Sequence, residues 1–177
     1  MRLRPVIGRD RLRHWYHVGC VVHAAPSLNL FHQQNTLLLG NDFMPLNVVL
    51  SGNPGYDAVA DFSPVSLLAH IANIMVVNPS VPARTVKELV TLARAQQGRV
   101  SFGTGGPGSL NDLISQVFRS ISNGKSLVVP YKGINPATIA MLSGEVDAAV
   151  ISVASAAQYV NAGKLRALAT LAPERSA

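Results

Sequence analysis

The alternation of short apolar runs with amphipathic segments is the feature of this sequence that most restricts its fold. Continuous apolar runs typical of buried strands occur at residues 36–40, 73–77, 100–104, 126–131, 147–152 and 165–171. Several of the segments between them have apolar residues at helical spacing or helix start and stop signals. This pattern predicts an α/β fold with a mainly parallel sheet and helices on both faces. Ligands of such sheets bind beyond the carboxyl ends of the strands.

The predicted helices have recognisable ends. Thr85 and Glu88 have the spacing of a capping box. Asn135 is expected to cap a later helix, which Gly144 ends. The helix after the strand at 100–104 is expected to bury an apolar stripe formed by Leu110, Leu113, Ile114, Val117 and Ile121.

Composition and charge exclude two classes of partner. Of 177 residues, 48% are hydrophobic, but no apolar run approaches the roughly 18 residues that a membrane-spanning helix needs, so we expect no direct membrane insertion. The net charge of +6 comes mainly from five arginines within the first thirteen residues. From residue 36 onward, ten Lys or Arg face eight Asp or Glu with no basic cluster, and we expect no nucleic acid as a partner.

Residues 1–35 differ from the rest of the chain. The single Cys20 excludes an internal disulfide, and four histidines lie there without a ligand-like spacing, so we expect no metal site. The basic stretch "RDRLRHWYH" interrupts the place where a signal peptide would have its apolar core. We expect residues 1–35 to be an irregular leader without a packed apolar face.

The stretch "SFGTGGPGSLNDL", residues 101–113, joins a predicted strand to a predicted helix. Gly103, Gly105 and Gly108 fit the dinucleotide fingerprint G-x-G-x-x-G, but the acid expected about 20 residues later is absent, because the next strand ends in "PYKG". The stretch also lacks the G-K-[ST] ending of a P-loop. Three interpretations stay open: a nucleotide site, a tight turn, or a cradle in which amides at a helix start bind a carboxylate. Ser109 could donate to a ligand or cap the helix.

Three longer stretches then suggest a family. "DFSPVSLLAHIANIMVVNPSVPARTVKELVTLARAQQGRVSFGTGGPGS", "VPYKGINPATIAMLSGEVDAAV" and "AGKLRALAT" resemble the extracytoplasmic solute receptors of tripartite tricarboxylate transporters, the TctC-like or Bug family. The resemblance implies a type II-like periplasmic binding protein that closes over a small organic carboxylate and presents it to membrane permease subunits. It further implies a periplasmic location, no cofactor and no enzymatic activity.

The resemblance also divides the chain. Residues 1–35 match nothing in the family, and residues 36–70 correspond to part of its first domain and the crossover. Residues 71–167 correspond to a nearly complete second, ligand-binding domain, and residues 168–177 to the start of the return to the first domain.

By residue-for-residue correspondence, the resemblance implies ligand-binding positions at Asn41, Thr104, Gly105, Gly106, Gly108, Ser109, Tyr131 and Ser152. Two departures from the family pattern matter. Ile151 and Ser152 stand where many members have Asp and Asn, which argues against an amino-acid ligand. Asp112 lies in the first turn of the helix, and we expect its carboxylate to face away from a bound anion.

The alternative function is a dinucleotide-dependent enzyme that uses the loop from Gly103 to Gly108. Such an enzyme needs converging catalytic groups. His70 is the one histidine after residue 35 and is expected to be packed or capped. Asp147 begins a strand and is expected at the end opposite the ligand. No catalytic set is apparent, so the receptor is the preferred interpretation.

Overall fold

The computed structural model describes residues 18–24, 37–40, 43–95 and 100–172. The chain divides into two compact units, Met1–Ile71 and Ala72–Ala177, which we call the first and second units. This boundary lies beside the one expected after residue 70.

The first unit contains a three-stranded antiparallel sheet in the order β2-β1-β3. Its elements are β1 (Val18–Ala24), β2 (Leu37–Gly40), α1 (Phe43–Ser51) and β3 (Phe62–His70). The strand expected at residues 36–40 is present, but it lies at the sheet edge with Leu39 67% exposed, so it is not buried. The sequence analysis did not predict α1.

The expectation that residues 1–35 are irregular is wrong for Val18–Ala24, which form β1. It is the central strand of its sheet, hydrogen-bonded to β2 on one side and β3 on the other. Its sequence, VGCVVHA, is rich in β-branched valine, which favours strands. Both partners of β1 come from later in the chain, so a search for local periodicity could not reveal the pairing. The other residues before Leu37 lie outside the described part.

The second unit contains a five-stranded sheet in the order β6-β5-β7-β4-β8. β5 is parallel to β6 and β7, whereas β4 is antiparallel to β7 and β8. Four of the five strands therefore run in one direction, and the sheet is mixed. The strands are β4 (Asn73–Val77), β5 (Val100–Thr104), β6 (Ser126–Pro130), β7 (Ala148–Ser152) and β8 (Arg166–Thr170).

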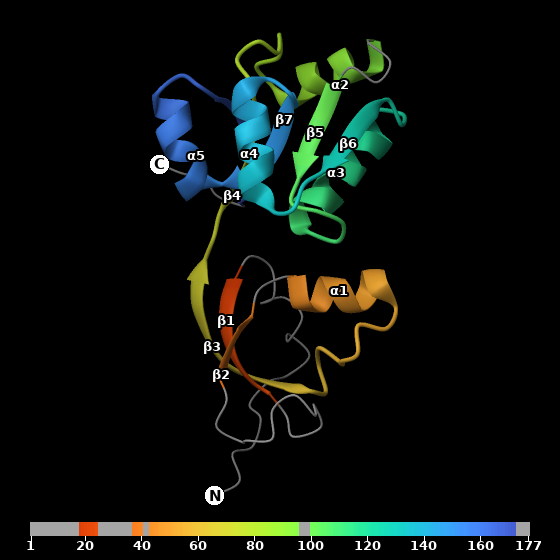
Figure 1. Ribbon diagram of the computed structural model, residues 1–177, viewed down its shortest axis with the longest axis vertical. Helices are drawn as coiled ribbons and strands as arrows, with labels where there is room; N and C mark the ends of the chain where they lie inside the picture. The colour runs from red at the N-terminus through yellow and green to blue at the C-terminus, as the bar shows by residue number, and fades with distance from the viewer. Residues whose placement is uncertain (1–17, 25–36, 41–42, 96–99, 173–177) are drawn as a thin grey trace, which may run out of the picture. The chain divides into compact units, whose positions relative to one another are not determined.

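Helices cover both faces of this sheet, as predicted (Figure 1). One core cluster joins the sheet to α2 and α3, and at its centre the rings of Phe102 and Phe118 lie 4.6 Å apart. The other cluster joins the opposite face to α4 and α5. The helices are α2 (Val86–Ala95), α3 (Leu110–Ile121), α4 (Ile134–Ser143) and α5 (Val153–Asn161).

Several predicted details need correction. Residues 168–170 do not start a return to the first domain, because they are part of β8, where Ala169 pairs with Met75. The cap of α4 is Gly133 and not Asn135, while Gly144 does end this helix in a left-handed conformation. The stripe expected to be buried on α3 is largely exposed at Leu113, Val117 and Ile121.

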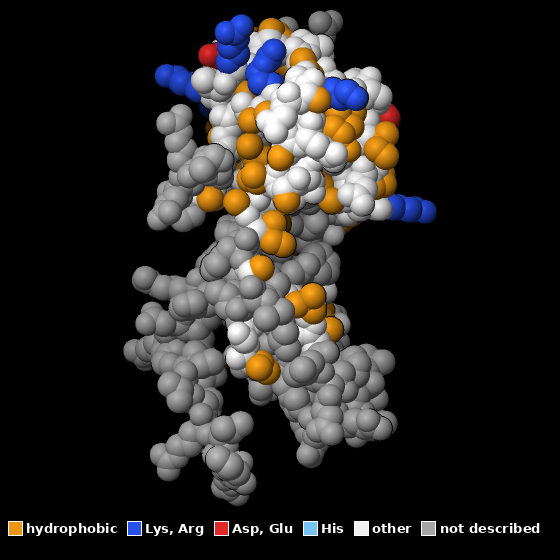
Figure 2. Space-filling view, turned by 90° about the vertical axis from the view of Figure 1, so that its left-hand side faces the viewer, with side chains coloured by type: hydrophobic (Ala, Val, Ile, Leu, Met, Phe, Trp, Pro, Cys, Tyr) orange, Lys and Arg blue, Asp and Glu red, His pale blue; other side chains and the backbone are white. Residues whose placement is uncertain are grey.

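The described residues contain no helix long and apolar enough to cross a membrane, and no group of three metal-ligating side chains. On the face shown in Figure 2, the Lys and Arg side chains lie mostly at one end of the second unit. Hydrophobic and uncharged groups cover most of the remaining described surface on that face, with few charged side chains among them. The described part of this face therefore presents no continuous basic strip of the kind that follows a nucleic-acid backbone.

Candidate functional site

Three strands of the second unit end at the same edge of the sheet, and a helix begins after each of them. Because β5, β6 and β7 run parallel, their carboxyl ends share this edge, which we call the carboxyl edge. α3, α4 and α5 start there, with Ser109, Gly133 and Ser152 as their caps. A helix start carries partial positive charge on unpaired amides, so three such starts favour an anion at this edge.

The glycine loop, residues 104–109, connects β5 to α3 and is tied to the segment after β6. The Tyr131 amide donates to the Thr104 carbonyl at 2.9 Å, and the Gly133 amide donates to the Gly105 carbonyl at 3.2 Å. Gly106 has φ of 110°, and a Cβ there would lie 3.2 Å from the Tyr131 carbonyl oxygen. The loop therefore needs glycine at this position, for conformation and for space.

Ser109 uses its hydroxyl within the loop. Its Oγ accepts from the Asp112 amide at 3.2 Å and donates to the Gly106 carbonyl at 2.7 Å. The Ser109 amide also donates to the Gly106 carbonyl, at 3.3 Å. Of the two roles considered for this side chain, the structure has the helix cap.

Asp112 does not face away from the loop as we expected. Its Oδ2 accepts a hydrogen bond from the Gly108 amide at 3.2 Å. Gly108 is in a left-handed conformation with φ of 78°, and its amide needs an acceptor. The nearby Asp112 carboxylate supplies one, so a negative charge already occupies part of the predicted cradle.

Three backbone amides at the glycine loop and at the start of α3 are not used as hydrogen-bond donors within the described part of the chain. Those of Gly106, Leu110 and Asn111 have no acceptor among the described residues. Leu110 and Asn111 belong to the first turn of α3 and are half-buried, whereas Gly106 is buried. These are the donors that the loop can offer to a ligand.

Asn111 was missed by the sequence analysis. Its Oδ1 accepts from the Gly105 amide and its Nδ2 donates to the Val150 carbonyl, both at 3.5 Å. It thus connects the glycine loop to β7. An amide side chain in the first turn of a helix that follows a glycine loop is a signal that could have indicated this role.

The remaining predicted positions lie in different settings. Thr104 is fully buried, and its Oγ1 has no hydrogen-bond partner among the described residues. Ser152 caps α5, its Oγ accepting from the Ser155 amide at 3.1 Å. Asn41 lies outside the described residues.

The backbone of Tyr131 adjoins the loop, but its side chain packs against the core cluster that includes α4. Its hydroxyl donates to Oε1 of Glu145 at 3.1 Å. Burial, and after it the hydrogen bond to Glu145, raises the pKa of the Tyr131 hydroxyl above its ordinary value. This hydroxyl is therefore protonated near neutral pH and engaged away from the loop amides.

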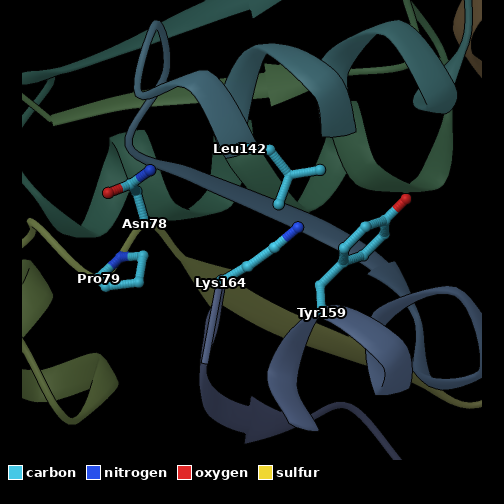
Figure 3. Close-up of a pocket in the computed structure, with 5 residues that line it drawn as sticks. All are labelled: Asn78, Pro79, Leu142, Tyr159 and Lys164. Atoms are coloured by element: carbon cyan, nitrogen blue, oxygen red, sulfur yellow. The ribbon is translucent and has the colours of Figure 1, made fainter. Parts of the chain in front are cut away.

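A pocket of about 500 Å³ lies at the opposite edge of the sheet (Figure 3). Its lining residues are Asn78, Pro79, Leu142, Tyr159 and Lys164. Asn78 follows β4, which is antiparallel to β7. Its backbone amide donates to the backbone carbonyl of Asp147 at 2.8 Å. Helices α4 and α5 end near this pocket, where the Asn78 side chain donates to the Met141 carbonyl and Lys164 is the charged residue of the lining.

Asp147 lies at this opposite edge, as expected. Its Oδ2 accepts from the amide and the hydroxyl of Ser101, at 2.7 and 2.8 Å. The carboxylate holds the beginnings of two neighbouring strands together and is separated from the loop by the length of β5.

Comparison of the chain with known protein families shows which family it belongs to. The model of the tripartite tricarboxylate transporter family receptor matches residues 35–177. The chain belongs to this receptor family. The match confirms the resemblance, which we placed from residue 36 onward, and it does not support a dinucleotide-dependent enzyme.

Individual relatives agree with this membership. Protein BugT of Bordetella pertussis is 32% identical over 143 residues, covering 80% of this chain and 44% of BugT. A solved periplasmic transporter is 29% identical with a TM-score of 0.67, covering 75% of this chain and 44% of that one. Rpa4515 of R. palustris, solved with adipate, is 29% identical with a TM-score of 0.62 over 68% and 40% of the two chains. The chain thus spans less than half the length of these relatives. The structural matches confirm the predicted periplasmic binding protein fold.

Proposed function

We propose that this protein is an extracytoplasmic receptor that binds a small organic carboxylate and delivers it, chemically unchanged, to the permease subunits of a tripartite transporter. We place its action in the periplasm, as for the solved relative described as a periplasmic transporter. The observation that carries the proposal is the set of unpaired amides at the start of α3, beside the glycine loop.

The chemistry of the carboxyl edge favours a carboxylate. Amides of a helix start bind the oxygens of an anion by hydrogen bonds that charge strengthens. At the end of β7, Ile151 is buried and Ser152 caps α5, so this strand end offers no acid to an amino group. A ligand without an amine needs no acid at that strand end. Adipate, found with Rpa4515, belongs to that class.

We propose that the protein does not react with its ligand, because the reactive side chains near the site have structural roles. The hydroxyls of Ser109 and Ser152 cap helices, and neither contacts a general base among the described residues. Asp147 binds Ser101 at the opposite edge. Nucleophilic catalysis requires a nucleophile within hydrogen-bond reach of a base.

Thermal unfolding with added ligands tests the receptor against the enzyme. A ligand that binds only the folded state stabilises it by about 1.4 kcal/mol at about ten times its dissociation constant. We expect adipate to raise Tm by about 5 °C under that condition, and NAD or NADH to leave Tm unchanged. A rise with the dinucleotide and none with any dicarboxylate would contradict the proposed function.

A further inference from the structure

Asp112 gives the glycine loop a fixed negative charge of its own. Its carboxylate reaches back from the first turn of α3 and accepts from the Gly108 amide at 3.2 Å. Its own amide is held by the Ser109 hydroxyl, so the residue is fixed at both ends. The carboxylate therefore lies at the loop itself.

We infer that Asp112 determines the charge of the ligand that this loop accepts: a single carboxylate group, as at one end of a linear dicarboxylate, and not the clustered carboxylates of a citrate-like tricarboxylate. This inference rests on the proposed function. It assigns a specificity-determining role to a residue that the sequence analysis placed outside the site.

The first argument is the supply of donors. Several donors of the loop are already used. The Asp112 carboxylate accepts from the Gly108 amide, and the Asn111 side chain accepts from the Gly105 amide. The Gly106 carbonyl accepts from both the hydroxyl and the amide of Ser109. The first-turn amides of Leu110 and Asn111 and the buried amide of Gly106 remain. A carboxylate has two oxygens, so the donors of the loop and of the first turn of α3 suffice for one such group and leave little for a second beside it.

The second argument is charge. Asp112 forms no ion pair among the described residues, so no neighbouring side chain neutralises its carboxylate. Lys132, in the turn after β6 at the same edge, forms no ion pair with a described residue, and because it is exposed to water it offsets the charge of Asp112 only weakly. A second ligand carboxylate close to the first would come near Asp112, and like charges in a partly buried site repel strongly. In a linear dicarboxylate the chain separates the two charged groups.

Titration calorimetry of the 177-residue chain with adipate and with citrate tests this inference. The variants are Asp112→Asn, which removes the charge but retains an oxygen that can accept from Gly108, and Glu88→Gln as a matched control. Glu88 also accepts a backbone amide at a helix start, from Arg84 at 2.7 Å. It differs in that α2 follows β4, whose end is at the opposite edge.

We expect the unmodified chain and the Glu88→Gln variant to bind adipate more tightly than citrate. Asp112→Asn should raise the affinity for citrate by about tenfold or more and that for adipate by clearly less. The inference is overturned if the unmodified chain binds both ligands equally, or if Asp112→Asn changes both affinities by the same factor; the proposed function survives either result. If no folded variant binds any carboxylate, the proposed function fails and the inference fails with it.

Discussion

Replacement of Gly106 by alanine is expected to abolish carboxylate binding at the glycine loop and to destabilise the second unit by about 1–3 kcal/mol. Gly106 has φ of 110°, which side chains of L-residues rarely adopt, and the new Cβ would lie 3.2 Å from the Tyr131 carbonyl oxygen. Relief of that contact moves the loop away from the segment after β6. The amides of Gly106 and Leu110 would then change position relative to each other.

Gly124→Ala is the matched control for this variant. Gly124 has φ of 75°, but a Cβ there meets nothing within 4 Å, and it follows α3 at the end away from the loop. We expect a comparable loss in urea denaturation and unchanged affinity for adipate. If Gly106→Ala binds adipate within about twofold of the parent, a difference below about 0.5 kcal/mol, the loop is only a turn.

The second large effect concerns the core. Phe102→Ala should lower the free energy of unfolding by about 3–5 kcal/mol, because it leaves a large cavity in a closely packed interior. Phe102 is fully buried on β5, and its ring lies against that of Phe118 from α3. Loss of this contact removes the packing that holds α3 on the sheet, so ligand binding should fall as well.

Urea denaturation measures this change, with Leu127→Ala as the comparison. Leu127 lies on the edge strand β6 and is 55% exposed, so its truncation should cost less than about 1 kcal/mol. Similar losses for the two variants would show that β5 and α3 do not form the centre of the core.

The sequence predicted those elements whose signals are local. One of the two hydrogen bonds of the predicted capping box at the start of α2 is present, with the Glu88 amide donating to Oγ1 of Thr85 at 3.1 Å. The carboxylate of Glu88 accepts from the backbone amide of Arg84, whereas the motif describes the amide of the next residue, Thr85, as the donor. Each strand of the second unit lies where an apolar run predicted it, because buried strands show continuous hydrophobicity.

The orientation of α3 could not be predicted in this way. Its buried face contains Ser115 and Phe118, while the apolar Val117 is 51% exposed. Ser115 can be buried because its hydroxyl donates to the Asn111 carbonyl at 2.7 Å, within the helix. An analysis of hydrophobic periodicity counts serine as polar and does not include a hydrogen bond that its hydroxyl makes within the helix. The position of Phe102 on the sheet then decides which side of the helix faces inward.

Asp112 illustrates the same limit within the candidate site. A rule about helix dipoles places an acid favourably in the first turn but does not say which amide its carboxylate will accept. The left-handed Gly108, whose amide points to that carboxylate, decides this. The loop itself was predictable because its glycines are required by the backbone.

The most direct test of the account is an amide NMR titration of the 177-residue chain with adipate. If the glycine loop is the carboxylate cradle, the largest shifts will fall on the amides of Gly106, Leu110 and Asn111, with little change around Asn78 and Lys164. Saturable shifts that cluster around Asn78 and Lys164 at the opposite edge, with the loop amides unmoved, would contradict it.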